Sequence, residues 1–296
     1  MKKWIVAMRL RTLPLALASI GMGVFLAMSK NALNLSVALM CFLTTLALQI
    51  LSNLANDYGD SIHGADHADR QGPQRAVQSG EITSPQMKTA IKLSILISLV
   101  FGVALLYISA IPFQVFVAFL ALGVLSIIAA ILYTNGKLPY GYIGLGDISV
   151  FLFFGFLGVL GTFYLQTKSI DWTMMLPAAS CGLLTVGVLN INNIRDIDSD
   201  IQAGKRSIPV MLGKHKARVY HWALLIGALV CATVYVTMNF IGISHYLFLI
   251  SMPLFIVNGI RVYNRYDAQT LDPLLKQLAL STVLFVILFG ISINLS

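Results

Sequence analysis

Charged residues are scarce in this chain. Asp, Glu, Lys and Arg together make up 11% of its 296 residues, whereas 57% are hydrophobic, and the mean hydropathy is +0.82. A water-soluble domain of this length carries far more charge on its surface. The composition therefore excludes an ordinary soluble protein and predicts one that is embedded in a lipid bilayer.

Cysteine is also rare. The three cysteines, Cys41, Cys181 and Cys231, each lie singly within an apolar run, without CxxC or His–Cys spacing. Free cysteine usually behaves as a small buried hydrophobic residue, so we expect neither zinc nor redox chemistry. The sequence has no signature of a serine, cysteine or histidine triad. Its basic residues are spread over short loops without a recognisable binding motif, so we expect no nucleic-acid partner.

Long uncharged apolar runs are abundant. A helix needs about 20 mainly apolar residues to cross the hydrocarbon core. The first candidate run follows a basic head, as a secretory signal does, but it exceeds the ~7 to 15 apolar residues of a signal, so we expect it to be retained. The sequence predicts one all-α integral membrane domain over residues 1–296. Its nine predicted spans are 13–29, 35–52, 89–109, 113–133, 148–166, 174–191, 219–238, 243–260 and 277–295.

The basic residues predict the orientation of these spans. If the N-terminus is inside, eighteen of the twenty Lys and Arg residues fall in inside loops, and only Lys30 and Lys168 fall outside. Cytoplasmic loops of membrane proteins carry this excess of positive charge. We therefore expect a cytoplasmic N-terminus and, because the number of spans is odd, a C-terminus on the outer side.

Two long inside loops, 53–88 and 192–218, carry eight of the twelve acidic residues. Each loop opens with asparagines at the end of a span, passes through aspartates and then reaches glycine and basic residues, as in "NLANDYGDSIHGADHADR" and "NINNIRDIDSDIQAGKR". Their separation by four spans indicates an internal duplication that places two half-sites opposite each other. Convergence on one ligand would give the same pattern.

The spacing of the aspartates points to a cation site. Asp196 and Asp200 share a face if a helix extends into the second loop, so we expect a positive group between them. In the first loop we expect a helix end near Gly64 that folds Asp66 back towards Asp60. Carboxylates are hard ligands that suit Mg²⁺, which keeps room for substrate phosphates. Two facing half-sites would accommodate two Mg²⁺ ions bridged by a diphosphate.

Basic side chains lie among these acids. Arg70, Arg195, Lys205 and Arg206 could contact the remaining phosphate oxygens. The alternative is a solvated loop in which acids and bases pair with each other. Two similar constellations at the membrane edge favour a binding site, because ionisable groups at membrane depth usually mark one. We expect His63 to lie on a polar loop surface rather than to bind metal.

At these residues the sequence resembles the UbiA-type intramembrane prenyltransferases, whose two loops read NxxxDxxxD and DxxxD. The second motif is complete, whereas the first begins at Asn56 and Asp60 and departs at Gly64, with Asp66 two residues later. This departure resembles the branch that prenylates dihydroxynaphthoate in menaquinone synthesis, the MenA type, as do "YTNGKLPYGYIGLGD" and "NNIRDIDSD". The match runs from "RLRTLP" to about residue 213, and the last three spans match only in hydropathy.

The resemblance implies a bundle of nine helices around a central cavity, under a cytoplasmic cap made by the two loops, in a bacterial inner membrane. It implies a transferase that couples an all-trans polyprenyl diphosphate to 1,4-dihydroxy-2-naphthoate with loss of CO₂ and diphosphate. Tyr140 and Asp147, in the third signature, become candidates for the acceptor end. The residues implied to bind Mg²⁺ and diphosphate are Asp60, Asp66, Asp196, Asp200, Asn56 and Asn192, with Arg70 and Lys205 neutralising the leaving group.

Three rival functions are considered. Within the same family, 4-hydroxybenzoate or another aromatic acid could be the acceptor. A CDP-alcohol phosphotransferase is also membrane-bound and rich in aspartate, but its DGxxAR-led motif is absent from the sequence. A cation-coupled transporter normally holds its acids near the middle of the bilayer, whereas these acids lie at the inside boundary.

Overall fold

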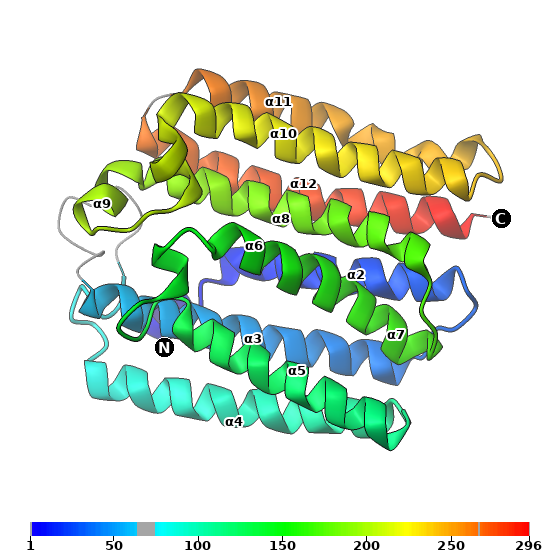
Figure 1. The fold of residues 1–296 in the computed structure, drawn as a ribbon, viewed down its shortest axis with the longest axis horizontal. Coiled ribbons are helices and arrows are strands. Elements are labelled where there is room, and N and C mark those ends of the chain that lie inside the picture. The colour runs from blue at the N-terminus through cyan, green and yellow to red at the C-terminus, as the bar shows by residue number, and fades with distance from the viewer. Residues whose placement is uncertain (1, 64–74, 266, 296) are drawn as a thin grey trace.

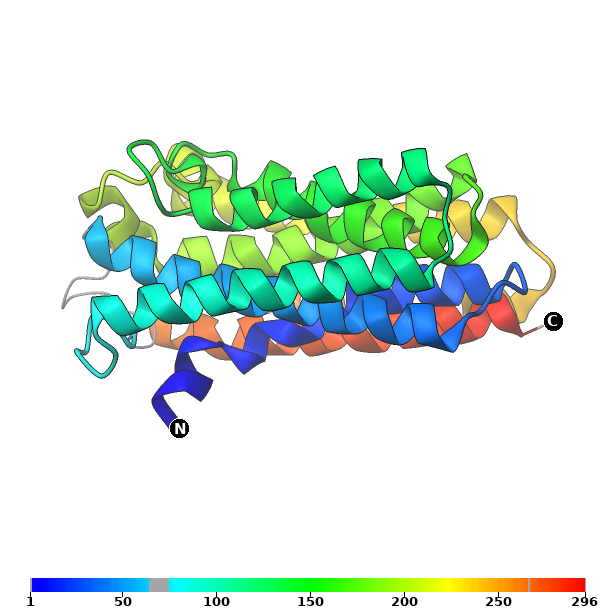
Figure 2. The same cartoon turned by 90° about the horizontal axis from the view of Figure 1, so that it is seen from below.

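The computed structural model describes residues 2–63, 75–265 and 267–295. Within these residues every regular element is a helix, which confirms the predicted all-α class. The long helices lie side by side along one axis, and the two chain termini lie at opposite ends of the bundle (Figure 1). The short N-terminal helix α1 (Lys2–Ala7) is set apart at one edge of the bundle (Figure 2).

The apolar helices correspond in order to the nine predicted spans. Among the described residues, eight are long and apolar enough to cross a bilayer, while α2 (Leu13–Met28) is apolar but shorter. Three of the eight change helix type along their length. The first is α6 (Gly146–Val150), the π-helix η3 (Phe151–Leu160) and α7 (Gly161–Thr167); the second is one turn, η4 (Trp172–Met174), leading into α8 (Met175–Arg195); the third is η5 (Ile243–Ser251) with α11 (Met252–Asn264). The other five are α3 (Leu35–Ile62), α4 (Ser84–Ile108), α5 (Phe113–Leu132), α10 (Ile208–Met238) and α12 (Ala268–Asn294).

Short elements connect these helices. They are η1 (Leu10–Thr12), η2 (Tyr140–Tyr142), η4 (Trp172–Met174) and α9 (Ile197–Gln202). Two of them, η2 and α9, lie at the end of the bundle where α3, α5 and α8 finish, and Figure 1 shows α9 there beside the start of α10. The polar connections that the sequence places inside the cell therefore lie together at one end.

Several helices extend beyond the apolar stretch that predicts them. α3 continues past the predicted span end at residue 52 to Ile62, close to the helix end expected near Gly64, so Asn56 and Asp60 lie on its last turns. Likewise α8 reaches Arg195, and α12 begins at Ala268. Hydropathy marks the length that crosses hydrocarbon, whereas a helix ends only where its backbone is capped or broken. The aspartate motifs are therefore held by rigid helix ends.

The main hydrophobic core lies where α2, α8, α10 and α12 pack together. Phe248, Phe285 and Phe289 are fully buried there, and Phe248 meets the other two rings edge to face at centroid distances of 5.8 Å and 5.6 Å. In contrast, α4 and α5 carry many exposed apolar side chains, including Leu96 at 58% and Phe113 at 78%. In a bilayer such faces contact lipid instead of water, so their exposed apolar side chains do not destabilise the protein.

Glycines let the fifth span approach its neighbours. A Cβ atom on Gly155 would lie 2.8 Å from the Ala178 carbonyl oxygen and 3.1 Å from the Gly182 Cα atom. η3 and α8 therefore cross backbone to backbone, as small residues permit in membrane helices. Gly158 and Gly161 line the cavity described below. The glycines of this span therefore provide both close helix contact and room for a cavity.

The crossing at Gly155 predicts a stability effect. Gly155→Ala should lower the free energy of unfolding by about 1–3 kcal/mol, because the added methyl group overlaps backbone that cannot move aside. Gly123→Ala is the matched control, since a Cβ atom there meets nothing within 4 Å, and it should be neutral or stabilising by up to ~1 kcal/mol. The measurement is thermal unfolding of both variants in detergent, and equal midpoints would contradict the crossing.

Candidate functional site

The end of the bundle where the polar connections lie together is called the cap end. Three segments that are distant in sequence meet there through one tyrosine. The Tyr142 hydroxyl donates to Asp60 Oδ1 at 2.8 Å. The Tyr142 carbonyl accepts the Arg206 backbone N–H at 2.8 Å, and Lys205 Nζ lies 5.9 Å from the centre of the Tyr142 ring. The connection between the fourth and fifth spans therefore joins the two aspartate-bearing segments, which meet as the sequence predicts.

The first half-site lies on the last turn of α3. Asp60 is 6% exposed and forms an ion pair with Arg75. Arg75 also donates to the Asn56 backbone carbonyl at 3.1 Å, while the Asn56 side-chain oxygen lies 3.2 Å from the Thr134 hydroxyl oxygen. Asp57, one residue beyond Asn56, accepts two backbone N–H groups from the turn at residues 76–77. Asp57 therefore fixes the returning chain and holds Arg75 near Asp60.

Part of the predicted first half-site lies outside the described residues. Asp66, Arg70 and the predicted bend at Gly64 all fall within residues 64–74. The side chain of His63, just before this segment, lies between two backbone carbonyls, with Nδ1 2.9 Å from the Gly59 oxygen and Nε2 3.0 Å from the Gly136 oxygen. His63 thus ties the end of α3 to the next inside connection, in agreement with a polar surface role.

The second half-site spans the junction of α8 and α9. Asp196 stands between the two helices, and its carbonyl accepts the Asp200 N–H at 2.8 Å, so the two aspartates remain one turn apart. We expected one positive group between these two aspartates, but each has a basic partner of its own. Arg195 binds Asp196 through two hydrogen bonds of 2.8 Å, and Lys205 Nζ lies 3.1 Å from Asp200 Oδ2.

The pKa of Asp200 depends on the charges of acids in both half-sites. Burial is the largest cause that raises the pKa of Asp200, and the charges of Asp196 and Asp60 raise it further, while Lys205 lowers it. Like charges act on each other in this way only when they are close. The acids of the two half-sites therefore lie close enough to repel one another, and a cation bound between them would relieve that repulsion.

The donor set fits Mg²⁺. Carboxylate oxygens of Asp60, Asp196 and Asp200 are the hard ligands that this ion prefers. Within the described ranges no three acidic, histidine or cysteine side chains gather closely enough to hold a metal alone. Mg²⁺ commonly uses one or two carboxylates and completes its shell with water and phosphate oxygens, so an incomplete protein shell agrees with joint binding of ion and diphosphate.

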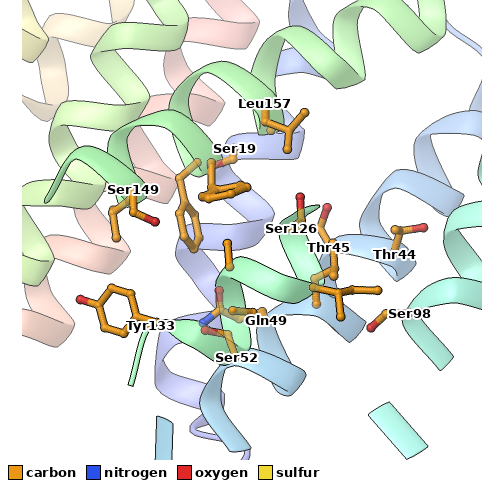
Figure 3. Close-up of a pocket in the computed structure, with 18 of the residues that line it drawn as sticks. Ser19, Thr44, Thr45, Gln49, Ser52, Ser98, Ser126, Tyr133, Ser149 and Leu157 are labelled. Atoms are coloured by element: carbon orange, nitrogen blue, oxygen red, sulfur yellow. The ribbon is translucent and has the colours of Figure 1, made fainter. Parts of the chain in front are cut away.

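A cavity of about 380 Å³ runs from this cap end into the bundle. Its walls come from α2–α8 and one residue of α12, and none of its described lining residues belongs to α10 or α11. Figure 3 shows Tyr133 and Ser149 at one side of the space and Thr44 and Ser98 at the other, with Leu157 above. The polar residues of the cap end that line it include Arg9, Asn56, Asp60, Arg75, Asn192 and Lys205.

The two acceptor-side candidates occupy different positions. Tyr140 lines the cavity, and its hydroxyl donates to the Ala129 carbonyl at 2.9 Å and lies 3.0 Å from Ser149 Oγ. Burial raises the pKa of Tyr140, so the hydroxyl keeps its proton at neutral pH. Asp147 is buried, accepts the Tyr220 hydroxyl at 3.0 Å, and is not among the described residues that line the cavity.

Several site residues were missed by the sequence interpretation. Tyr142 lies in the signature "PYGYIGLGD", where Tyr140 was chosen instead, so a signal was available. Arg75 follows Arg70 by five residues and had no distinguishing feature. Asp272, which pairs with Arg195, lies in the last span, where no polar motif draws attention. Cys41 and Cys181 are buried and Cys231 is partly buried, in agreement with packing roles.

Comparison with known proteins agrees with this geometry. The chain matches the UbiA prenyltransferase family over residues 15–291. It is 45% identical to the 1,4-dihydroxy-2-naphthoate octaprenyltransferase of Escherichia coli over 99% of this chain and 95% of that protein. It is also 45% identical to the protein of that name from Haemophilus influenzae, over 99% and 96% of the two chains. The similarity therefore includes the last three spans, beyond the extent expected from the motifs.

Solved structures share the fold at low sequence identity. A UbiA homologue from Aeropyrum pernix superimposes with a TM-score of 0.69 at 18% identity over 96% of each chain. A UbiA homologue from Archaeoglobus fulgidus, in a structure bound to DMAPP and Mg²⁺, superimposes with a TM-score of 0.66 at 17% identity over 99% of each chain. At this identity the likeness establishes the fold alone.

The raised pKa of Asp200 predicts how divalent cations bind. Protons compete with a cation for this carboxylate, so affinity for Mn²⁺ should fall as pH is lowered, beginning above the pH at which an ordinary aspartate is protonated. Asp200→Asn should weaken binding and flatten this pH dependence. Asp198→Asn is the control, because Asp198 is exposed and pairs with Lys214. Electron paramagnetic resonance of free Mn²⁺ measures both, and an unchanged pH profile in Asp200→Asn would contradict the assignment.

Proposed function

The chain belongs to the UbiA prenyltransferase family, and from this premise we propose its reaction. It transfers a polyprenyl group from an all-trans polyprenyl diphosphate to 1,4-dihydroxy-2-naphthoate, with loss of CO₂ and diphosphate, to give demethylmenaquinone. The observation that carries the proposal is that Asp60, which lines a mainly apolar cavity, lies close enough to Asp200 and Asp196 for their charges to interact. Full-length relatives at 45% identity bear the name of this activity.

The choice of acceptor rests on those relatives. Both act, by name, on 1,4-dihydroxy-2-naphthoate, and each covers nearly the whole chain. This favours the naphthoate over 4-hydroxybenzoate. Tyr140, whose hydroxyl stays protonated within the cavity wall, remains our candidate for the acceptor side. Asp147 accepts a hydrogen bond from Tyr220 of α10 and so helps to hold the connection that carries Tyr140.

We assign Mg²⁺ binding to Asp60, Asp196 and Asp200, with Asp66 from the segment outside the described residues. When bound, Mg²⁺ stabilises the negative charge that develops on the departing diphosphate. The number of ions in the proposal is two, one for each half-site. Family structures bound to Mg²⁺ with DMAPP and to Mg²⁺ with GPP support the use of a divalent ion.

The chain's own cations supply further stabilisation of the leaving group. Arg75 and Lys205 both line the cavity and each already holds a site carboxylate. Fixed positive charges aimed at developing negative charge are usually the largest single contribution of a protein to such a reaction. Arg70, which lies outside the described residues, completes our proposed diphosphate cradle.

The cavity walls protect the reactive group. Breaking the allylic C–O bond leaves a cation that water would quench, and an apolar lining excludes that water. The electron-rich naphthoate ring then captures the cation, so no protein nucleophile is needed. Val103, Leu122 and Val124 line the cavity and are each about 40% exposed at the lipid-facing surface, at 43%, 40% and 39%. We propose that the long tail leaves the cavity past these residues.

We propose that the cap end faces the cytoplasm in the bacterial inner membrane, with the C-terminus outside. The excess of basic residues on that side supports this orientation, and the opposite placement of the termini agrees with it. The position of the acids at an end of the bundle, rather than at mid-depth, counts against the cation-coupled transporter.

One experiment tests the acceptor. Membranes that contain the chain are given a polyprenyl diphosphate, Mg²⁺ and both aromatic acids in equal amounts. Mass spectrometry should find demethylmenaquinone as the prenylated product. A prenylated 4-hydroxybenzoate as the main product would reject the naphthoate assignment while leaving prenyl transfer intact.

A second experiment tests the site. Asp60→Asn and Asp196→Asn should each lower kcat by about 100-fold or more, because each removes charge that interacts with the diphosphate and its ions in the transition state. Asp198→Asn, which changes the exposed aspartate between Asp196 and Asp200, should retain activity. Wild-type rates in either of the first two variants would reject the proposed site.

A further inference from the structure

Arg195 is a fully enclosed charge at the cap end. Its side chain is 0% exposed, and it is not among the described residues that line the cavity. The sequence suggested a phosphate contact for it, but the guanidinium is occupied by three oxygen-bearing side chains. They belong to Asn192 and Asp196 on its own segment and to Asp272 near the start of α12.

The geometry fixes the orientation of Asn192. An Arg195 nitrogen lies 2.8 Å from the Asn192 side-chain oxygen. A guanidinium has only donors, so the atom of the amide that faces it must be the oxygen. Within the described part of the chain, the amide nitrogen of Asn192 donates to no other group, and Asn192 lines the cavity. The side of Asn192 that is available to a ligand is therefore its NH₂ group.

An NH₂ group cannot bind a metal ion, but it can donate to a phosphate oxygen. We propose that Arg195, anchored by Asp272, is a positioning residue that fixes Asp196 and makes Asn192 a hydrogen-bond donor to the diphosphate. This inference rests on the proposed function, because it assumes that a diphosphate occupies the cavity beside Asn192. The family resemblance implies that Asp196 and Asn192 both belong to one group that binds Mg²⁺ and diphosphate, whereas this inference gives the two residues different roles.

Asp272 gives the arrangement its anchor. Arg195 binds both Asp196 and Asp272, and its planar guanidinium holds Asp196 through two parallel hydrogen bonds. A planar fork of this kind fixes the direction of a carboxylate as well as its position. Asp272 is 35% exposed, so it can be changed without burying an uncompensated group. It also connects the last span, which supplies one lining residue, to the second half-site.

The sharpest test is Asn192→Asp, which replaces the NH₂ group by an oxygen and adds negative charge at almost constant size. A donor lost to the diphosphate should weaken binding of inorganic pyrophosphate, in the presence of Mg²⁺, by about tenfold or more. Binding of Mn²⁺ alone should be unchanged or tighter. Tighter or unchanged pyrophosphate binding in this variant would overturn the proposal, because a metal-ligating oxygen gains from becoming a carboxylate.

The anchor is tested at its exposed end. Asp272→Asn should raise the dissociation constant for pyrophosphate and the KM for polyprenyl diphosphate by about tenfold, the usual effect of losing a partner that orients a ligand, with a smaller change in kcat. Asp272→Glu, which keeps the charge, should restore most of the loss. Asp198→Asn, which breaks the exposed pair with Lys214, should change neither constant.

These readouts separate the proposal from its premise. Thermal unfolding of each variant confirms that it is folded before binding is measured. Pyrophosphate and Mn²⁺ binding are measured without an acceptor, so they decide the role of Asn192 even if another aromatic acid proves to be the acceptor. A folded Asp272→Asn variant with wild-type pyrophosphate affinity would reject Arg195 as a positioning residue.

Discussion

Carboxylates buried at the edge of a bilayer need a positive charge close to each of them. Removing such a group from water without a partner costs several kcal/mol. Three carboxylates of the site meet this constraint with one base each, and the rest of the site is arranged around these pairs. The three pairs are Asp60 with Arg75, Asp196 with Arg195, and Asp200 with Lys205. Because two of the bases line the cavity and the third does not, the pairs have different chemical roles.

The fold brings these pairs together by extending its helices past the hydrocarbon. α3 carries Asn56 and Asp60 on its final turns, and α8 carries Asn192 and ends at Arg195. Gly59 allows the close approach of α3 to the end of α5, where a Cβ atom would lie 2.4 Å from the Thr134 hydroxyl oxygen. The site is therefore built on rigid elements, as a site that must hold two charged ligands in register requires.

The sequence was sufficient for the fold and for the residue types of the site, but not for their partners. Apolar runs predict nine spans because the bilayer sets their length, and the two asparagine-led loops predict a shared site because their acids are unusual in so apolar a chain. Arg75, Tyr142 and Asp272 were missed because their importance depends on contacts across more than one span. The predicted spans stop short of the polar ends of α3 and α12 because hydropathy does not detect a polar helical turn in water; for α3 the aspartate spacing and Gly64 supplied the missing signal.

The two half-sites look alike in sequence, yet the structure distinguishes them. Asn192 faces the Arg195 guanidinium, which has only donors, so the side-chain oxygen of Asn192 must point towards Arg195. Asn56 faces the Thr134 hydroxyl, which can donate or accept, so either end of that amide is free to face the ligand. The guanidinium behind Asn192 therefore leaves that amide one orientation, whereas the hydroxyl beside Asn56 is compatible with both orientations of its amide.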